Sequence, residues 1–211
     1  SNISDDLDGV DTTQKLVIIA RYISNRLVST HHIITKGIRN ITQKHFECAN
    51  LLNCTIRYLV FYENNADGIA LYVMLFFVPL VSFIGISKEA VNTFQVKSKY
   101  FEPLVLNGKG ATPKGTAVGV LNDLLSVSNI SDEWNLKSEF HPVLRTSKAF
   151  RIFIRIETTI FSASFLGKIT EKVIQQTNNC ILILTYPTSF EELECKLEKI
   201  DDKLSYFPVL D

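Results

Sequence analysis

A glycine-rich loop, NGKGATPKG, comes nearer to a phosphate-binding motif than any other segment of the chain. Gly110 and Gly115 have the spacing of the two glycines in G-x-x-x-x-G-K-[ST], whose backbone N–H groups and lysine surround phosphates. Thr116 stands where that motif has its lysine, and Pro113 removes one N–H group from the loop. We therefore interpret the segment as a flexible connection between two elements.

The histidines do not fall into a pattern that predicts a catalytic or metal site. His31 and His32 are adjacent, and adjacent residues of a helix do not face one ligand together. His45 and Cys48 are three residues apart and could be neighbours on a helix, but Cys48 falls on the apolar stripe, which favours an inert core thiol. His141 has no G-x-S-x-G pattern near it. The sequence predicts no catalytic residue, no cofactor and no metal.

The cysteines indicate a reducing compartment. Cys48, Cys54, Cys180 and Cys195 form no C-x-x-C pair and have no zinc-finger spacing to histidines. Reduced thiols of this kind are typical of intracellular proteins, so we expect the cytoplasm or the nucleus.

Charge is balanced over the chain but divided between its two ends. The net charge is zero, with 22 basic and 22 acidic residues, which argues against a general polyanion binder. Residues 12–46 nevertheless contain basic side chains and no acidic one, whereas residues 188–211 are mainly acidic. The basic stretch is open to three interpretations: a solvated helix face, a surface for a protein partner, or a contact with nucleic acid or anionic lipid. The predicted contacts are Arg21, Arg26 and Arg39.

The segment after Pro187 has the pattern of a helix with one apolar stripe. Ser189 and Glu192 make a capping box. The apolar positions that follow are spaced by three and four residues, as in a heptad, and they are Phe190, Leu193, Leu197, Ile200 and Leu204. So short a stripe needs a sheet or another helix to cover it. We predict that Phe190, Leu193, Leu197 and Ile200 contact a partner protein.

Residues Gly68–Ser87 carry no charged side chain, so they could form either a membrane span or buried strands. The upstream segment CTIRYLVFY is also rich in β-branched and aromatic residues, and ENNADG separates the two runs. Two such runs around a short turn segment are the signature of a β-hairpin. Pro79 should end the second strand because it lacks a backbone donor. The sequence favours a buried hairpin over a membrane span.

The remaining patterns predict an α+β domain. It has a largely antiparallel sheet with a central hairpin, packed against N-terminal helices and the heptad-patterned C-terminal helix. Residues 1–10 are acidic and expected to be frayed, and residues 11–211 are expected to form one domain. We expect helices in 11–37, 38–52, 116–127 and 164–176, and strands in 93–106, 148–158 and 180–186.

No motif points to a reaction, so the leading functional hypothesis is a non-enzymatic one. The divided charge and the apolar C-terminal stripe favour a protein–protein interaction module, an adaptor, scaffold or subunit of an intracellular complex. The first alternative is a small-ligand-binding or enzymatic α+β domain with an apolar pocket. The second alternative is a membrane-associated protein that uses residues 68–87.

Overall fold

The computed structural model describes residues 3–87, 91–110, 112–128, 141–142, 146–157, 168–177, 179–197 and 203–210. The chain is an α+β protein, as predicted. It divides into two compact units, one made of Ser1–Pro79 and His141–Asp211 and the other of Leu80–Phe140. A single domain over residues 11–211 stays a prediction.

The larger unit contains most of the helices and strands. Its first half holds α1 (Ile3–Asp8), α2 (Val10–Ser24), β1 (Arg26–Leu27), the 3-10 helix η1 (Thr30–His32), β2 (Ile34–Thr35), α3 (Gln43–Leu51), β3 (Cys54–Asn65) and β4 (Gly68–Pro79). Its second half holds β7 (His141–Pro142), β8 (Arg151–Glu157), β9 (Thr170–Thr177), β10 (Cys180–Thr185), α5 (Phe190–Leu197) and β11 (Lys203–Val209). Residues 3–8 are thus helical, within the stretch expected to be frayed.

The predicted hairpin is confirmed as the pair β3–β4, which is antiparallel from Cys54↔Pro79 to Asn65↔Gly68. In the turn, the side chain of Asn65 accepts hydrogen bonds from the backbone N–H groups of Asp67 and Gly68. The strand ends at Pro79, as expected. The other edge of β4 pairs in parallel with β2 at Tyr72 and Val73 and with β11 at Phe77.

Strand β4 is buried on both of its faces, which explains its unbroken apolar sequence. On one face, Ile69, Leu71 and Val73 pack with residues of α2. On the opposite face, Tyr72 and Phe76 belong to an aromatic cluster whose other rings are Phe61, Phe150 and Phe190. Among the described residues, no helix is long and apolar enough to cross a membrane.

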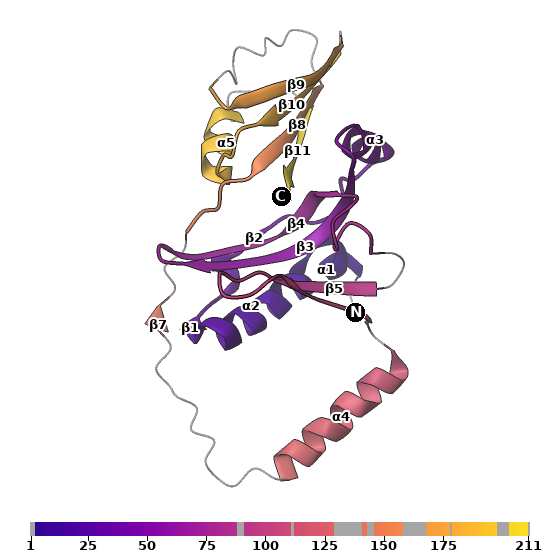
Figure 1. Ribbon diagram of the computed structural model, residues 1–211, viewed down its shortest axis with the longest axis vertical. Coiled ribbons are helices and arrows are strands. Elements are labelled where there is room, and N and C mark those ends of the chain that lie inside the picture. Colours follow the sequence, from indigo (N-terminus) through magenta and orange to yellow (C-terminus); the bar gives the residue numbers. More distant parts are fainter. Residues whose placement is uncertain are drawn as a thin grey trace. The chain divides into compact units, whose positions relative to one another are not determined.

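The strands of the second half continue this sheet in the order β11-β8-β10-β9, all antiparallel (Figure 1). Residues 170–177, predicted to be the end of a helix, form the edge strand β9 instead. Helix α5 packs Phe190 against the ring of Tyr206 in β11 at a centroid distance of 6.2 Å. Leu204, predicted as the last position of the heptad stripe, lies in β11.

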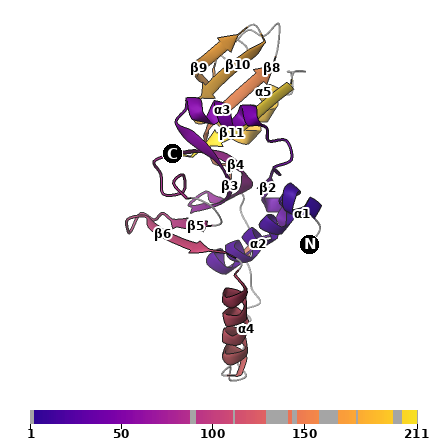
Figure 2. The ribbon, with the colours of Figure 1, turned by 90° about the vertical axis from the view of Figure 1, so that its right-hand side faces the viewer.

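The smaller unit contains the antiparallel pair β5 (Val91–Val96) and β6 (Leu104–Lys109), followed by α4 (Pro113–Ser128) (Figure 2). One strand was predicted over 93–106, but two antiparallel strands, β5 and β6, occupy this part of the chain. The predicted helix at 116–127 lies within α4. The helical spacing of its apolar side chains predicts that they point inward, but they are exposed, namely Val120, Leu121, Leu124 and Leu125.

Candidate active site

The junction of α1 and α2 gathers charged side chains around one glycine. Gly9 is the N-cap of α2 and has a φ of 80°, in the left-handed region that favours glycine. Its Cα lies against the hydroxyl group of Tyr58, so a Cβ at this position would overlap that oxygen. The chain therefore turns here only because residue 9 has no side chain.

Helix α1 is held in place by the segment after β2. The backbone N–H of Ile38 donates to the carbonyl of Leu7 at 2.8 Å. Arg39 binds the Asp8 carboxylate with both arms of its guanidinium, Nε to Oδ1 at 2.5 Å and Nη2 to Oδ2 at 2.9 Å. It also donates to Ser4. The hydrogen bond from Arg39 lowers the pKa of Asp8, so this carboxylate is occupied and ionised.

Directly after the glycine, α2 presents a carboxylate and an ammonium group on one face. Lys15 Nζ lies 2.6 Å from Asp11 Oδ2. The Lys15 side chain is about two-thirds exposed and the Asp11 side chain about half exposed. Their spacing of four residues brings them together on a helix. On the inner side of the same helix, Thr13 is buried and its hydroxyl lies 2.8 Å from that of Thr35 in β2. The pair thus stands on the exposed side of a helix whose inner side contacts β2.

Tyr58 carries a buried hydroxyl group for which the described part of the chain provides no hydrogen-bond partner. Burial raises the pKa of this phenol, so it remains protonated. An unpaired buried hydroxyl costs about 1–3 kcal/mol. We expect Tyr58→Phe to raise the free energy of unfolding by about 1 kcal/mol, measured by urea denaturation. Tyr206→Phe, which removes a hydroxyl that does have partners, should lower it.

A second polar cluster joins the residue after β2 to the C-terminal half of the same unit. Lys36 Nζ donates to the hydroxyl of Tyr206 and lies 3.4 Å from Glu194 Oε1. Tyr206 in turn donates to Glu194 at 3.0 Å. Burial lowers the pKa of Lys36 and is the main cause that raises the pKa of Tyr206. The three side chains bind one another, so we interpret this cluster as one that stabilises the contact between the two halves of the unit.

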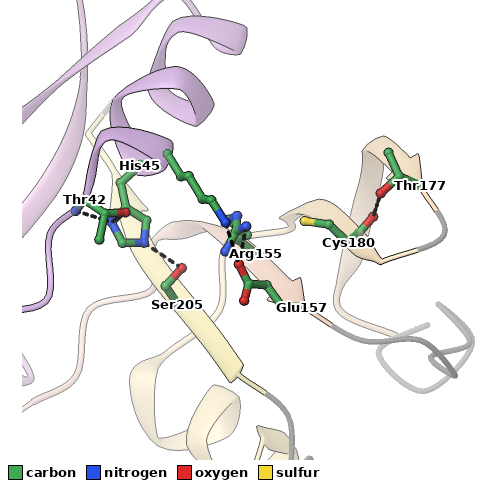
Figure 3. A network of polar contacts seen from close by, with 8 residues as sticks. Thr42, His45, Arg155, Glu157, Thr177, Cys180 and Ser205 are labelled. Carbon is green, nitrogen blue, oxygen red and sulfur yellow. Dashed lines mark hydrogen bonds and ion pairs between the residues drawn. The ribbon is translucent and has the colours of Figure 1, made fainter.

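A third cluster surrounds His45 at the start of α3 (Figure 3). Its ring lies between the backbone of Thr42 and the hydroxyl of Ser205. Nearby in β8, Arg155 Nη2 lies 2.5 Å from Glu157 Oε1. This cluster also joins the two halves of the unit. Of the three clusters, only the Asp11–Lys15 pair belongs to a single helix.

The predicted partner-contact residues of the C-terminal helix lie in the chain's own core. Phe190, Leu193 and Leu197 are at most 6% exposed, and Ile200 lies outside the described residues. These side chains are covered by the protein itself. Their contact with another protein stays an untested prediction.

The three predicted arginines are not brought together by one surface feature that the structure defines. Arg21 donates through Nε to the carbonyl of Val28 at 2.6 Å, and Arg26 lies in β1. Arg39 is bound to Asp8. Binding of protein, nucleic acid or anionic lipid by residues 12–46 was not tested and stays a prediction.

The other candidate groups are placed separately. The segment predicted as a flexible connection, residues 107–115, is mostly regular structure, because its residues up to Lys109 belong to β6 and those from Pro113 belong to α4. Cys48 is buried in a core cluster, where burial raises the pKa of its thiol. In the described part of the chain, no group of three or more histidine, cysteine or acidic side chains could hold a metal ion.

The sequence interpretation missed the pair Asp11–Lys15. In the sequence, Asp11 and Gln14 have the spacing of a capping box, and Lys15 is one of the basic residues of 12–46. The available signal was their spacing of four residues directly after an acidic segment and a glycine. That spacing is common on solvated helices, so by itself it indicates no site.

Comparison with known proteins assigns the first part of the chain to a family. Residues 1–125 match the family model described as homoserine dehydrogenase. The homoserine dehydrogenase of Methanocaldococcus jannaschii is 31% identical over 124 residues, which cover 59% of this chain and 35% of that protein. That of Lactococcus lactis is 23% identical and covers 100% of this chain and 55% of that protein.

Solved structures agree with this assignment at the level of the fold. The homoserine dehydrogenase of Thiobacillus denitrificans superimposes with a TM-score of 0.80 at 20% identity, over 99% of this chain and 54% of that one. That of S. aureus at pH 6.5 gives a TM-score of 0.76 at 20% identity, over 100% and 55%. The chain thus spans about half or less of the length of the proteins that it matches.

These matches contradict the leading functional hypothesis. The prediction of a non-enzymatic adaptor, scaffold or complex subunit is wrong, and so is the leaning against an enzyme, because the matching family and relatives are dehydrogenases. The alternative of an enzymatic α+β domain fits better. The error arose because the absence of a motif was taken as evidence, although active sites are assembled from residues that no short motif contains.

Proposed function

Because the chain belongs to the homoserine dehydrogenase family, we propose that it forms part of an enzyme that interconverts the alcohol group of homoserine and an aldehyde. The Asp11–Lys15 pair is its site for the substrate oxygen. The observation that carries the proposal is the exposed ammonium group of Lys15, held 2.6 Å from Asp11 Oδ2 within the matched residues.

The chemistry needs a group that moves a proton to or from the substrate oxygen. When an aldehyde becomes an alcohol, its carbon gains a hydride and its oxygen gains a proton. A nicotinamide cofactor, held by residues other than those described, would supply or accept the hydride. The ammonium of Lys15 can donate the proton. Asp11 fixes the position of that ammonium through the ion pair. The exposed carboxylates of Asp5 and Asp6 on α1 add negative charge that favours the α-ammonium group of an amino acid.

Dehydrogenases commonly use a nicotinamide cofactor, whose dinucleotide is held by G-x-G-x-x-G between a strand and a helix. The residues of this chain do not fit that pattern. Where β6 leads into α4, Pro113 stands at the position of the third glycine after Gly108 and Gly110. The proposal therefore concerns only the alcohol, its proton and the charged groups around it. Four free thiols agree with an intracellular site of action.

Ligand binding tests the proposed contact between Lys15 and the substrate oxygen. Homoserine and 2-aminobutyrate differ in that hydroxyl group alone. We expect the protein at its native length to bind homoserine more tightly by about 10- to 150-fold, the value of one hydrogen bond to a charged group. Lys15→Met should abolish this preference in calorimetric titrations.

The matched control is Lys114→Met, which removes an exposed lysine of α4. This variant should retain the preference for homoserine. An unchanged preference in Lys15→Met would contradict the contact. If the wild-type protein bound neither amino acid, the proposed substrate itself would be wrong.

A further inference from the structure

One imidazole both caps helix α3 and joins it to the C-terminal sheet. His45 Nδ1 accepts a hydrogen bond from the backbone N–H of Thr42 at 2.9 Å, which caps the start of α3. Nε2 lies 3.1 Å from the hydroxyl of Ser205 in β11. The ring also meets the Phe207 ring of β11 edge-on at a centroid distance of 5.1 Å. Figure 3 shows His45 between Thr42 and Ser205.

These two contacts specify the protonation state of the ring. A backbone N–H can only donate, so Nδ1 of His45 must carry a free lone pair. The single proton of the neutral ring is then on Nε2, which donates to Ser205. A second proton would be placed on Nδ1, opposite the N–H of Thr42. Two donors would face each other, and the hydrogen bond from the Thr42 N–H, one of the two arms of the α3 capping box, would be lost.

The charged groups around the ring also oppose its protonation. His45 is 7% exposed. From β8, Arg155 and Glu157 face the ring, and Glu157 is itself paired with Arg155 and lies 3.4 Å from Lys44 of α3. Burial is the main cause that lowers the pKa of His45, the charge of Arg155 lowers it further, and Glu157 raises it. The neutral ring is therefore favoured when α3 is seated.

We propose that His45 is a proton-operated latch, which holds α3 against β11 when neutral and releases the start of α3 when protonated. This role is independent of the reaction assigned to the Asp11–Lys15 pair. The folded pKa lies below the unfolded value of about 6.5, so the contribution to stability is complete above that value. It is lost as the pH falls through the pKa of the folded state, because the unfolded or released form then binds the extra proton.

The chain contains an internal comparison for this residue. His32 Nδ1 accepts a hydrogen bond from the backbone N–H of Ser29 at 2.9 Å, in a capping box of the same kind at η1. Its contacts lie within that local turn, whereas those of His45 reach strand β11. If acid weakened histidine caps in general, both caps would be weakened. Release of α3 from the sheet, in contrast, should depend on the protonation of His45 alone.

The test is a pH titration of the chain with labelled histidine rings, followed by NMR, together with amide hydrogen exchange. We expect His45 to titrate below the ordinary histidine value of about 6.5, with Nε2 protonated in the neutral form. Exchange in α3 and in β11 near Ser205 should become faster through the His45 midpoint. The ratio of closed to open α3 should fall about tenfold for each unit by which the pKa of His45 lies below its ordinary value. In His45→Gln this pH dependence should disappear, and in His32→Gln it should remain.

Two results would overturn the latch. One is a midpoint of His45 at or above the ordinary histidine value of about 6.5. The other is exchange in α3 that does not change through the His45 midpoint. The wild-type titration decides both even if His45→Gln does not fold. Ser205→Ala provides a second variant, in which exchange at α3 should already be faster at neutral pH, and unchanged exchange in this variant would also count against the latch.

Discussion

Lys15→Met is expected to lower kcat for homoserine oxidation by about 10²- to 10⁴-fold, the usual contribution of a positioned acid–base group. The loss should fall mainly on kcat, because the proton is transferred in the reaction step and the exposed side chain provides little of the packing. The measurement is steady-state kinetics in both directions with the protein at its native length.

Two further variants separate proton transfer from charge. Lys15→Arg retains a positive charge beside Asp11 but cannot release a proton in the working pH range, so it should remain nearly as inactive as Lys15→Met. Asp11→Asn keeps the amine and removes its anchor, so its loss should be smaller. Near-wild-type kcat in Lys15→Arg would limit Lys15 to a charge that orients the substrate. Near-wild-type kcat in Lys15→Met would exclude it from the reaction.

Gly9→Ala is expected to destabilise the larger unit by about 3 kcal/mol. A side chain in the left-handed region costs about 1–2 kcal/mol, and crowding in a packed position costs about 1–3 kcal/mol. Both apply at Gly9, which has a φ of 80° and lies against the Tyr58 hydroxyl. Thermal and urea denaturation measure the loss. Gly119→Ala, where a Cβ would meet nothing within 4 Å, should cause none.

The double variant Gly9→Ala/Tyr58→Phe separates the two causes. Removing the hydroxyl group relieves the overlap but leaves the backbone strain, so part of the stability should return. The two changes should therefore be non-additive, as expected for residues in contact. Additive effects would show that the overlap with Tyr58 contributes nothing and that the backbone conformation alone requires glycine.

The hairpin could be predicted because its local sequence favours the same structure that the tertiary contacts impose. Both strands are rich in β-branched and aromatic residues, and Asn65 and Gly68 form the turn between them. Strand β9 could not be predicted in this way. Phe165, Ile169 and Val173 have helical spacing, yet residues 170–177 form an edge strand that pairs with β10. An edge strand shows only a weak alternation of apolar and polar residues. Its strand conformation is decided by pairing with a neighbouring strand, which local helical spacing does not reveal.

The C-terminal pattern shows the same limit. The apolar stripe from Phe190 to Leu204 is regular in sequence. In the structure, however, α5 is described as far as Leu197, and Leu204 is a strand residue that pairs with Ile156 in β8.

The candidate site was missed for a different reason. The spacing of Asp11 and Lys15 in the sequence is that of any ion pair on a solvated helix. Two structural features distinguish this pair, namely the turn at Gly9 and the anchoring of α1 by Arg39. Both depend on tertiary contacts that local patterns do not contain.

The placement of β11 has a consequence for synthesis on the ribosome. This strand pairs with β8 along one edge and meets β4 at Phe77 on the other, where the N–H of Leu210 donates to the Phe77 carbonyl at 2.8 Å. The sheet that joins the two halves of the larger unit is therefore incomplete until Leu210 has emerged from the exit tunnel. Until then the edge of β4 near Phe77 lacks its β11 partner, and its backbone is open to pairing with another chain.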